Sequence, residues 1–209
     1  MTDTADYTHE AEAFAKGFLA VAGVDEVGRG PLAGPVTAAA VILDPGRIPG
    51  GIADSKALTR PARERLDAEI RAVARVAVAH ASVEEIDTLN ILRAAHLAMC
   101  RAMQAVGADY ALIDGPHLPR EMTCPGVALV KGDALCLSIA AASIVAKVAR
   151  DALMVDLAQQ HPGYGWETNM GYGAKRHISA LQNLGPTPHH RRSFAPVHNI
   201  LCRDNSITD

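Results

Sequence analysis

The chain has 209 residues, of which 49% are hydrophobic and 21% are charged. This excludes a peptide too short to bury a core and predicts one domain with a smaller appendage. The formal net charge of −3 excludes no class of partner. The charges are unevenly distributed, because acidic residues predominate in residues 1–26 and basic residues in residues 161–203. Two such regions brought together suit a polyanionic ligand.

The cysteines and the apolar segments bear on where the protein works. The four cysteines include no pair with C-x-x-C spacing, so a zinc site is not expected, and we interpret them as free thiols of a reducing compartment. The residues before Phe18 are acidic, whereas a secretory signal begins with basic residues. The longest apolar run, residues 134–146, is too short to span a bilayer. We therefore predict a cytoplasmic protein without membrane association.

The start of the chain predicts two neighbouring strands. Residues 1–17 are expected to be disordered or frayed, and the apolar run over 18–24 predicts a buried strand that ends at Asp25 and Glu26. Residues 35–43 predict a second strand. The few residues between the two strands are rich in glycine and proline and leave no room for a crossover helix. The two strands are therefore predicted to pair in antiparallel fashion.

Helices and strands alternate along the rest of the chain. A helix is predicted to begin at Thr59, and a capping box formed by Ser82 and Glu85 opens a helical region that reaches Val106. The other predicted elements are strands over 73–79, 110–113 and 127–130, a long helix over 135–160, and a helix over 175–184. This order predicts an α/β fold, with a mixed five-stranded sheet flanked by helices and a small helical C-terminal extension.

Acidic side chains follow three of the predicted strands, at Asp25 and Glu26, Asp114, and Asp133. In an open α/β sheet, ligands gather at the carboxyl ends of the strands. Carboxylates gathered there repel one another unless hard cations lie between them, and Mg²⁺ prefers oxygen ligands. Two such ions about 3.5–4 Å apart support phosphodiester hydrolysis. Adjacent strand residues point to opposite faces, so the access of both Asp25 and Glu26 to a metal is left open.

Two alternatives compete with a metal site here. Acids at strand ends are commonly no more than solvated turn residues. The pattern Gly28-x-Gly30-x-x-Ala33 also fits a loose dinucleotide-binding fingerprint. That fingerprint needs a helix N-terminus directly after the glycines, and Pro31 and Pro35 leave no room for one. Acids directly before the turn would also repel a phosphate group in the absence of a metal. We favour the metal site.

The segment Ala22-Gly-Val-Asp-Glu-Val-Gly-Arg-Gly-Pro-Leu-Ala-Gly-Pro-Val resembles the opening motif of the ribonuclease HII family. The resemblance extends over about residues 20–197 and includes further motifs in the family's order. These are Asp54-Ser55-Lys56, Ile113-Asp114-Gly115, Lys131-Gly132-Asp133, residues 139–151, Gly171-Tyr172-Gly173 with His177, and residues 190–194. Motifs of this length in this order are highly specific.

The resemblance implies a ribonuclease H-like catalytic domain over 18–160 and a helical substrate-binding extension over 161–209. It implies hydrolysis of the RNA strand of RNA–DNA hybrids and nicking on the 5′ side of single ribonucleotides embedded in duplex DNA. The products would carry 3′-hydroxyl and 5′-phosphate ends. Two Mg²⁺ or Mn²⁺ ions are implied, and the family's catalytic and metal-binding carboxylates map to Asp25, Glu26, Asp114 and Asp133.

The resemblance also implies how the substrate is read. The family's glycine–arginine–glycine turn maps to Gly28, Arg29 and Gly30 and reads the ribose 2′-hydroxyl, which distinguishes RNA from DNA. The family's junction-sensing tyrosine maps to Tyr172, and Tyr164 in a similar Gly-Tyr-Gly sequence is the alternative. Further contacts to the phosphate backbone are expected from Lys56, Ser143, Arg191 and Arg192.

Several residues are left out of the predicted site. Asp151 lies four residues after Lys147 on the long helix, so a helical ion pair explains it. His177 lies near Tyr172, and its role is left open. Residue 174 is an alanine where the family commonly has a threonine, which puts a hydroxyl contact there in doubt. No glutamine-and-aromatic clamp-binding peptide is found at the C-terminus. Docking on a sliding clamp is therefore not supported. We also expect a monomer.

Two rival activities remain. A junction resolvase of the same fold would not need the glycine–arginine–glycine turn and would cut duplexes made only of DNA. A hybrid-binding module without catalysis would not need the carboxylates, and all four are present. The expected partners are thus RNA–DNA hybrids and ribonucleotide-containing duplex DNA.

Overall fold

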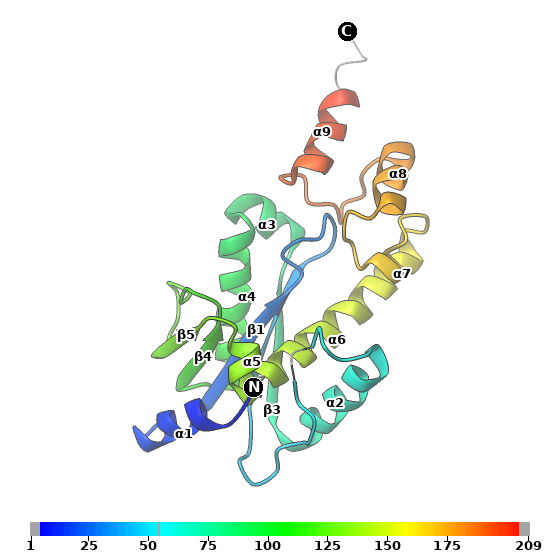
Figure 1. Ribbon diagram of the computed structural model, residues 1–209. Helices are drawn as coiled ribbons and strands as arrows, with labels where there is room; N and C mark the ends of the chain where they lie inside the picture. The colour runs from blue at the N-terminus through cyan, green and yellow to red at the C-terminus, as the bar shows by residue number, and fades with distance from the viewer. Residues whose placement is uncertain (1–4, 54, 205–209) are drawn as a thin grey trace.

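The computed structural model describes residues 5–53 and 55–204, without the side chains of residues 203 and 204. A five-stranded sheet in the order β3-β2-β1-β4-β5 forms its centre (Figure 1). The strands are β1 Val21–Val27, β2 Val36–Ile42, β3 Arg75–Ala81, β4 Tyr110–Asp114 and β5 Gly126–Leu129. β1 pairs antiparallel with β2 and parallel with β4, and β5 is parallel to β4. The predicted mixed five-stranded sheet and the antiparallel first pair are confirmed.

The sheet is covered on both faces, which explains why β1 and β2 are nearly continuous apolar runs. α4 (Ile91–Val106) packs on one face against a cluster that includes Val24 and Ile113. α6 (Leu137–Gln160) and α2 (Arg60–Val73) cover the other face. A Cβ at Gly23 would collide with the backbone of Ser138, so the start of α6 lies directly against β1. Alanines along α6 maintain this close approach.

The helical region predicted over residues 83–106 is in fact two helices, α3 (Val83–Leu89) and α4. The break lies at Asn90, whose φ is 71°. Asparagine tolerates this left-handed region, and its side-chain oxygen accepts the N–H groups of Leu92 and Arg93 at 3.0 and 3.1 Å. The predicted capping box at α3 is confirmed, since Ser82 and Glu85 bond reciprocally. The predicted helical region is thus confirmed, whereas its division at this internal cap was not predicted.

The prediction of a frayed N-terminus is wrong for residues 5–17, while residues 1–4 lie outside the described part of the chain. α1 (Thr8–Ala15) is a helix that buries Glu10 and Ala13. The Glu10 carboxylate accepts the backbone N–H of Ser138 at 2.7 Å and a bond from the Cys136 thiol at 3.2 Å. Ser138 lies in the first turn of α6, where a carboxylate satisfies orphan amides and favours the helix dipole.

The C-terminal extension lies beyond the far end of α6 (Figure 1). It contains α7 (Trp166–Asn169), the predicted α8 (Lys175–Leu184) and α9 (Ala195–Asp204), while the short α5 (Gly132–Leu135) precedes α6. Its apolar core includes Trp166 and Leu181 and takes in Leu32 and Ala33 from the loop between β1 and β2. The extension is therefore packed onto that loop. Within the described residues, no helix combines the length and the hydropathy needed to cross a membrane.

Candidate active site

The predicted carboxylates lie along one edge of the sheet. Asp25 and Glu26 are near the end of β1, and Asp114 ends β4, which runs parallel to β1. Asp133 lies in α5, just after the parallel strand β5. Asp25 is only 8% exposed. Burial, followed by the negative charges of Glu26, Asp114 and Asp133, raises the pKa of Asp25 well above its usual range. The four acids are therefore close enough to repel one another.

Asp25 and Glu26 lie where β1 loses one of its neighbours. The pairing of β1 with β4 ends at Val24 and Ile113, whereas its pairing with β2 continues through Val27. The strand does not unwind, so the two side chains leave it toward opposite faces. On the side facing β4, however, no ladder encloses them. Both acids are therefore at an open edge of the sheet, which leaves each of them room to approach a metal from its own face.

Glu26 is paired inside the protein. Its Oε1 atom lies 3.1 Å from a guanidinium nitrogen of Arg29, the central residue of the following turn. Burial raises the pKa of Glu26, the bond from Arg29 opposes the shift, and the charge of Asp114 adds to it. Asp25 accepts the backbone N–H of Glu26 at 2.7 Å. These contacts orient the two carboxylates differently.

Asp114 and Asp133 are connected through Gly132. Asp114 Oδ1 accepts the backbone N–H of Gly132 at 2.7 Å. A Cβ on Gly132 would approach Ile139 Cδ1 to 2.6 Å, so a larger residue here would require the Ile139 side chain to shift. Asp133 Oδ2 lies 3.6 Å from Lys56 Nζ, on a lysine side chain that is 83% exposed. Lys56 thus stands at the surface beside the carboxylates, while its neighbour Asp54 lies outside the described residues.

The donor set suits a hard divalent cation, because it consists of carboxylate oxygens whose mutual repulsion a cation would relieve. As placed, however, the described residues include no group of three or more His, Cys, Asp or Glu side chains that could hold a metal ion. The structure brings the four carboxylates to one edge without gathering them around one point.

The turn after β1 requires a glycine at position 28 and passes close to Tyr172 at position 30. Gly28 has φ of 91°, and a Cβ there would collide with the side chain of Arg150. A Cβ on Gly30 would lie 3.3 Å from Cε1 of Tyr172, whose side chain is half exposed. The structure thus places Tyr172 against the turn. Tyr164 is instead buried, and its hydroxyl donates to the carbonyl of Gly185 at 2.7 Å.

A family model described as ribonuclease HII matches residues 22–197 of the chain. The chain belongs to the ribonuclease HII family. Its relatives include the ribonuclease HII of Cereibacter sphaeroides, which is 69% identical over 205 residues and 97% of both chains. That of Ruegeria pomeroyi is 64% identical over 201 residues, 95% of this chain and 86% of the relative. The protein is therefore a hydrolase, an endoribonuclease that acts on RNA–DNA.

Solved structures agree with this fold. The ribonuclease H2 of Pyrococcus horikoshii superposes with a TM-score of 0.74 at 26% identity, over 90% of this chain and 99% of that one. The Archaeoglobus fulgidus protein, solved as a PCNA:RNase HII complex, gives 0.72 at 28% identity over 83% and 94%. Bst-RNase HIII in complex with Mn²⁺ gives 0.72 at 20% identity over 90% and 71%, which supports the fold alone.

The prediction that Arg191 contacts phosphate in this ribonuclease HII is wrong, because its side chain is completely buried. The guanidinium donates to three carbonyls of the turn region: Gly34 at 2.9 Å, Arg29 at 2.9 Å and Gly28 at 2.6 Å. Burial lowers the pKa of Arg191 to about 9, and the positive charge of Arg150 adds to the shift. Arg191 therefore fixes the turn instead of binding the substrate.

Arg150 of α6 has a matching role that the sequence did not reveal. It is 1% exposed and donates to the carbonyls of Ala33, Pro35 and Met170 at 3.0 to 3.1 Å. Met170 lies two residues before Tyr172, so Arg150 connects the loop after β1 to the loop of the tyrosine. One signal was available, namely an arginine in an alanine-rich, otherwise buried helix. Its partners are carbonyls, which no sequence pattern marks.

Ser143 is also wrongly predicted as a phosphate contact. It is buried, and its hydroxyl accepts the backbone N–H of Ser55 at 3.3 Å. It thereby supports the segment that carries Lys56.

Arg192, by contrast, is exposed, and its backbone N–H donates to Asp87 of α3 at 3.0 Å. Asp87 also accepts two bonds from Ser193, which anchors the start of the C-terminal segment.

His177 belongs to a buried polar network behind Tyr172. Its Nδ1 lies 2.8 Å from the carbonyl oxygen of Tyr172, which can only accept, so Nδ1 carries the proton. Its Nε2 then accepts from Trp166 Nε1 at 3.0 Å and from His190 Nε2 at 3.1 Å. His190 Nδ1 in turn accepts the N–H of Thr187 at 2.9 Å. Both histidines are therefore neutral, and the network fixes the tyrosine loop.

Burial is the main cause of the low pKa of both histidines, and it lowers that of His190 to about 3, helped by the neighbouring His177.

Asp151, which was left out of the predicted site, forms the ion pair expected from the sequence. Asp151 pairs with Lys147 at 2.8 Å on α6.

Proposed function

We propose that this ribonuclease HII nicks duplex DNA on the 5′ side of an embedded ribonucleotide and also cuts long hybrids, leaving 3′-hydroxyl and 5′-phosphate ends. The observation that carries the proposal is the edge of the sheet, where buried, mutually repelling carboxylates adjoin the glycine turn and Tyr172. The acids supply the site of hydrolysis, and the turn lies where the ribose would be recognised. We assign catalysis and metal binding to Asp25, Glu26, Asp114 and Asp133.

Two divalent cations, Mg²⁺ or Mn²⁺, would be held by these carboxylates. When bound, such ions activate a water and stabilise the leaving oxygen of a phosphodiester. The all-oxygen donor set supports this choice. Neutralisation by the ions would also remove the repulsion that raises the pKa of Asp25. Lys56 stands beside Asp133, where it suits a contact to a neighbouring phosphate.

The turn would recognise the ribose through its backbone. Gly28 is buried, whereas Arg29 and Gly30 are exposed. The carbonyls of Gly28 and Arg29 accept from Arg191, so the amide N–H groups of Arg29 and Gly30 are better suited to meet the 2′-hydroxyl oxygen. A DNA nucleotide lacks that oxygen. Selectivity for RNA therefore rests on the rigid presentation of the turn.

Tyr172 would read the next sugar. Its ring contacts the position of Gly30 and leaves about half its surface exposed. An aromatic face packed against a deoxyribose gains apolar contact, whereas a 2′-hydroxyl there would lose hydration without a partner. This favours a ribonucleotide followed by a deoxyribonucleotide.

A duplex DNA of fixed sequence with one ribonucleotide tests the proposal. Incubation with Mg²⁺ or Mn²⁺ should give a single nick on the 5′ side of the ribonucleotide, mapped on a denaturing gel, with ends that a polymerase extends. An Asp114→Asn variant should bind the duplex but not cut it. Absence of a nick would refute the proposal, and equal cutting of an all-DNA duplex would favour a junction resolvase.

We further propose a cytoplasmic monomer with a catalytic domain over 18–160 and a substrate-binding extension over 161–209. The two halves share the core around Leu32, so the boundary is one of function more than of folding. PCNA is bound by the Archaeoglobus fulgidus relative. We include in the proposal that the present protein acts without docking on a sliding clamp. Light scattering of the purified protein, alone and with a sliding clamp, tests both expectations.

A further inference from the structure

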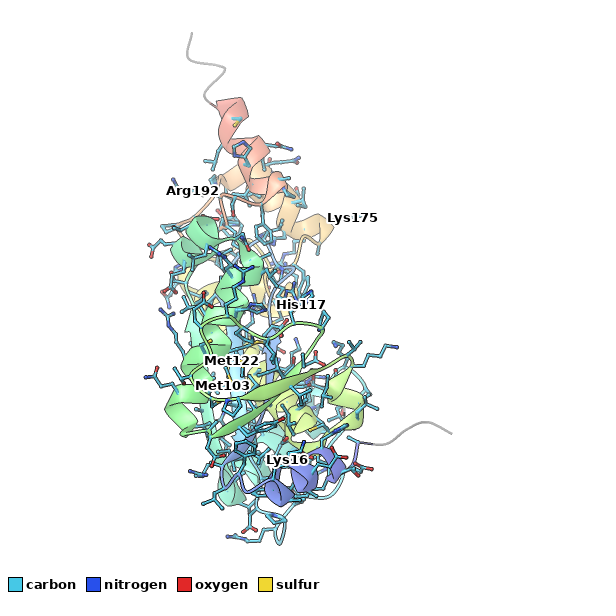
Figure 2. The ribbon with its side chains drawn as sticks, turned by 90° about the vertical axis from the view of Figure 1, so that its left-hand side faces the viewer. Lys16, Met103, His117, Met122, Lys175 and Arg192 are labelled. Atoms are coloured by element: carbon cyan, nitrogen blue, oxygen red, sulfur yellow. The ribbon has the colours of Figure 1, made fainter. Side chains whose placement is uncertain are left out.

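A groove beside the candidate active site has no role in the chemistry described above. It has a volume of about 710 Å³ and lies between the first turns of α4, the loop that joins β4 to β5, and β5 itself. We call it the α4–β5 groove. Figure 2 looks onto this side of the molecule and shows His117 and Met122 on the loop in front of the sheet. Its walls therefore come from three separate parts of the chain.

The α4–β5 groove is lined with basic side chains on two of its walls. Arg93 and His96 come from α4, and His117 and Arg120 come from the loop, with Glu121 as the one acid among the lining residues. Arg93, His117 and Arg120 are exposed. The spaces between them are apolar, since the lining also includes Leu92, Leu118 and Val127. Cations above apolar strips match a nucleic-acid strand, whose phosphates alternate with sugar faces.

Two observations place the groove near the candidate active site. Its lining residue Pro116 lies two positions after Asp114. At its other wall, the positive charge of Arg29 reaches His96 and, after the larger effect of burial, helps to lower the pKa of that histidine. The groove is therefore near the carboxylate edge at Asp114 and the ribose-reading turn at Arg29. A strand leaving that edge on this side would enter it.

We propose that the α4–β5 groove is a sequence-independent binding site for the phosphate backbone of the substrate duplex, outside the ribonucleotide and its immediate junction. Arg93 and Arg120 make the phosphate contacts from opposite walls. This inference rests on the proposed function for the identity of the substrate. It adds a second point of attachment that sets how much flanking duplex the enzyme needs.

The variant Arg93→Gln/Arg120→Gln tests the groove, with Arg65→Gln/Arg71→Gln as the matched control. The control removes the same charge from α2, which covers the opposite face of the sheet. Binding is measured by fluorescence anisotropy of labelled duplexes in Ca²⁺, and cleavage separately in Mg²⁺. Each duplex carries one ribonucleotide, with long flanks or with one flank shortened on either side. Thermal unfolding verifies that both variants are folded.

On the long duplex, the groove variant should bind about 10-fold more weakly or worse than the control, with kcat little changed. The slope of log affinity against log salt should become shallower by about 2, because two phosphate contacts are lost. Shortening the flank that reaches the groove should abolish the difference in affinity between the two variants. Shortening the other flank should leave that difference in place. Equal affinity and equal salt slope for both variants on every duplex would refute the proposal that the groove binds the phosphate backbone. Because binding is measured without cleavage, failure of the wild type to nick would refute only the proposed activity.

Discussion

At the scale of single residues, the buried acids of the carboxylate edge are expected to lower the stability of the fold. Asp25 is buried among like charges that raise its pKa, and nothing in the packing of the sheet needs an acid there. We expect Asp25→Asn to raise the free energy of unfolding by about 1–3 kcal/mol in EDTA at pH 8, because it removes a buried charge. Chemical denaturation measures this change. A less stable variant would mean that the acids are not in mutual repulsion.

Asp25→Asn should also respond differently from the wild type when a divalent metal is added. Wild-type protein should gain thermal stability as Mg²⁺ or Mn²⁺ is added, since a ligand bound only by the folded state stabilises it. Asp25→Asn should gain much less and should not cleave. An equal gain in both proteins would place the metal elsewhere.

Two tyrosines provide a matched pair of substitutions. Tyr172→Ala should leave the free energy of unfolding within about 0.5 kcal/mol, because the side chain is half exposed, but should reduce cleavage at a single ribonucleotide at least 10-fold. Tyr164→Phe should cost about 1 kcal/mol through its lost bond to Gly185 and leave cleavage unchanged. Reversal of this pattern would assign junction reading to Tyr164.

Arg191, which is buried at the turn, gives a further prediction. In Arg191→Lys, one ammonium replaces a guanidinium fork that donates to three carbonyls. We expect the free energy of unfolding to fall by about 2–4 kcal/mol. Discrimination between RNA and DNA at the cleavage site should weaken as well. The exposed Arg192→Lys is the control, and an equally small effect in both variants would remove the assigned role of Arg191.

At the scale of elements, hydrogen bonds that cross between elements were the hardest to foresee. The strands and α8 were located from local patterns, because apolar runs and glycine–proline breaks are visible in a short window. α1 was missed because its stability depends on Glu10 meeting α6, more than a hundred residues away. The turn and Tyr172 were predicted from motifs as parts of the site, yet Arg150 was missed and Arg191 was predicted to contact phosphate. Their partners are backbone carbonyls, which leave no mark in the sequence.

The histidine network of the extension predicts a pH dependence. Both histidines have a lower pKa in the folded protein, so the unfolded chain binds more protons between about pH 3 and the ordinary histidine pKa of about 6.5. Their contribution to stability is complete above pH 6.5 and declines as the pH falls through this window. The free energy of unfolding of wild type and His190→Gln, measured from pH 7.5 to 5, should converge as the pH falls. Parallel curves would exclude the network as the source.

At the scale of the whole molecule, the two halves meet at the loop between β1 and β2. That loop carries the glycine turn on its outer side, while Leu32 and Ala33 enter the core of the extension. Arg150 and Arg191 join the two halves from within. Sequence motifs predicted which residues belong to the site, but only the fold shows that hydrogen bonds from these two arginines connect the glycine turn with the tyrosine loop. Under the proposed function, selectivity for the junction should depend on this connection more than on any one contact.

The buried pair Leu32 and Ala33 also has a consequence for recombination between relatives. The substrate-binding unit proposed above is not a contiguous piece of the gene, since it combines the loop over residues 28–35 with residues 161–202. A chimera that exchanged only the C-terminal segment would bring together surfaces that were never matched. Grafting the junction preference of one relative onto another should succeed only when both segments are transplanted together.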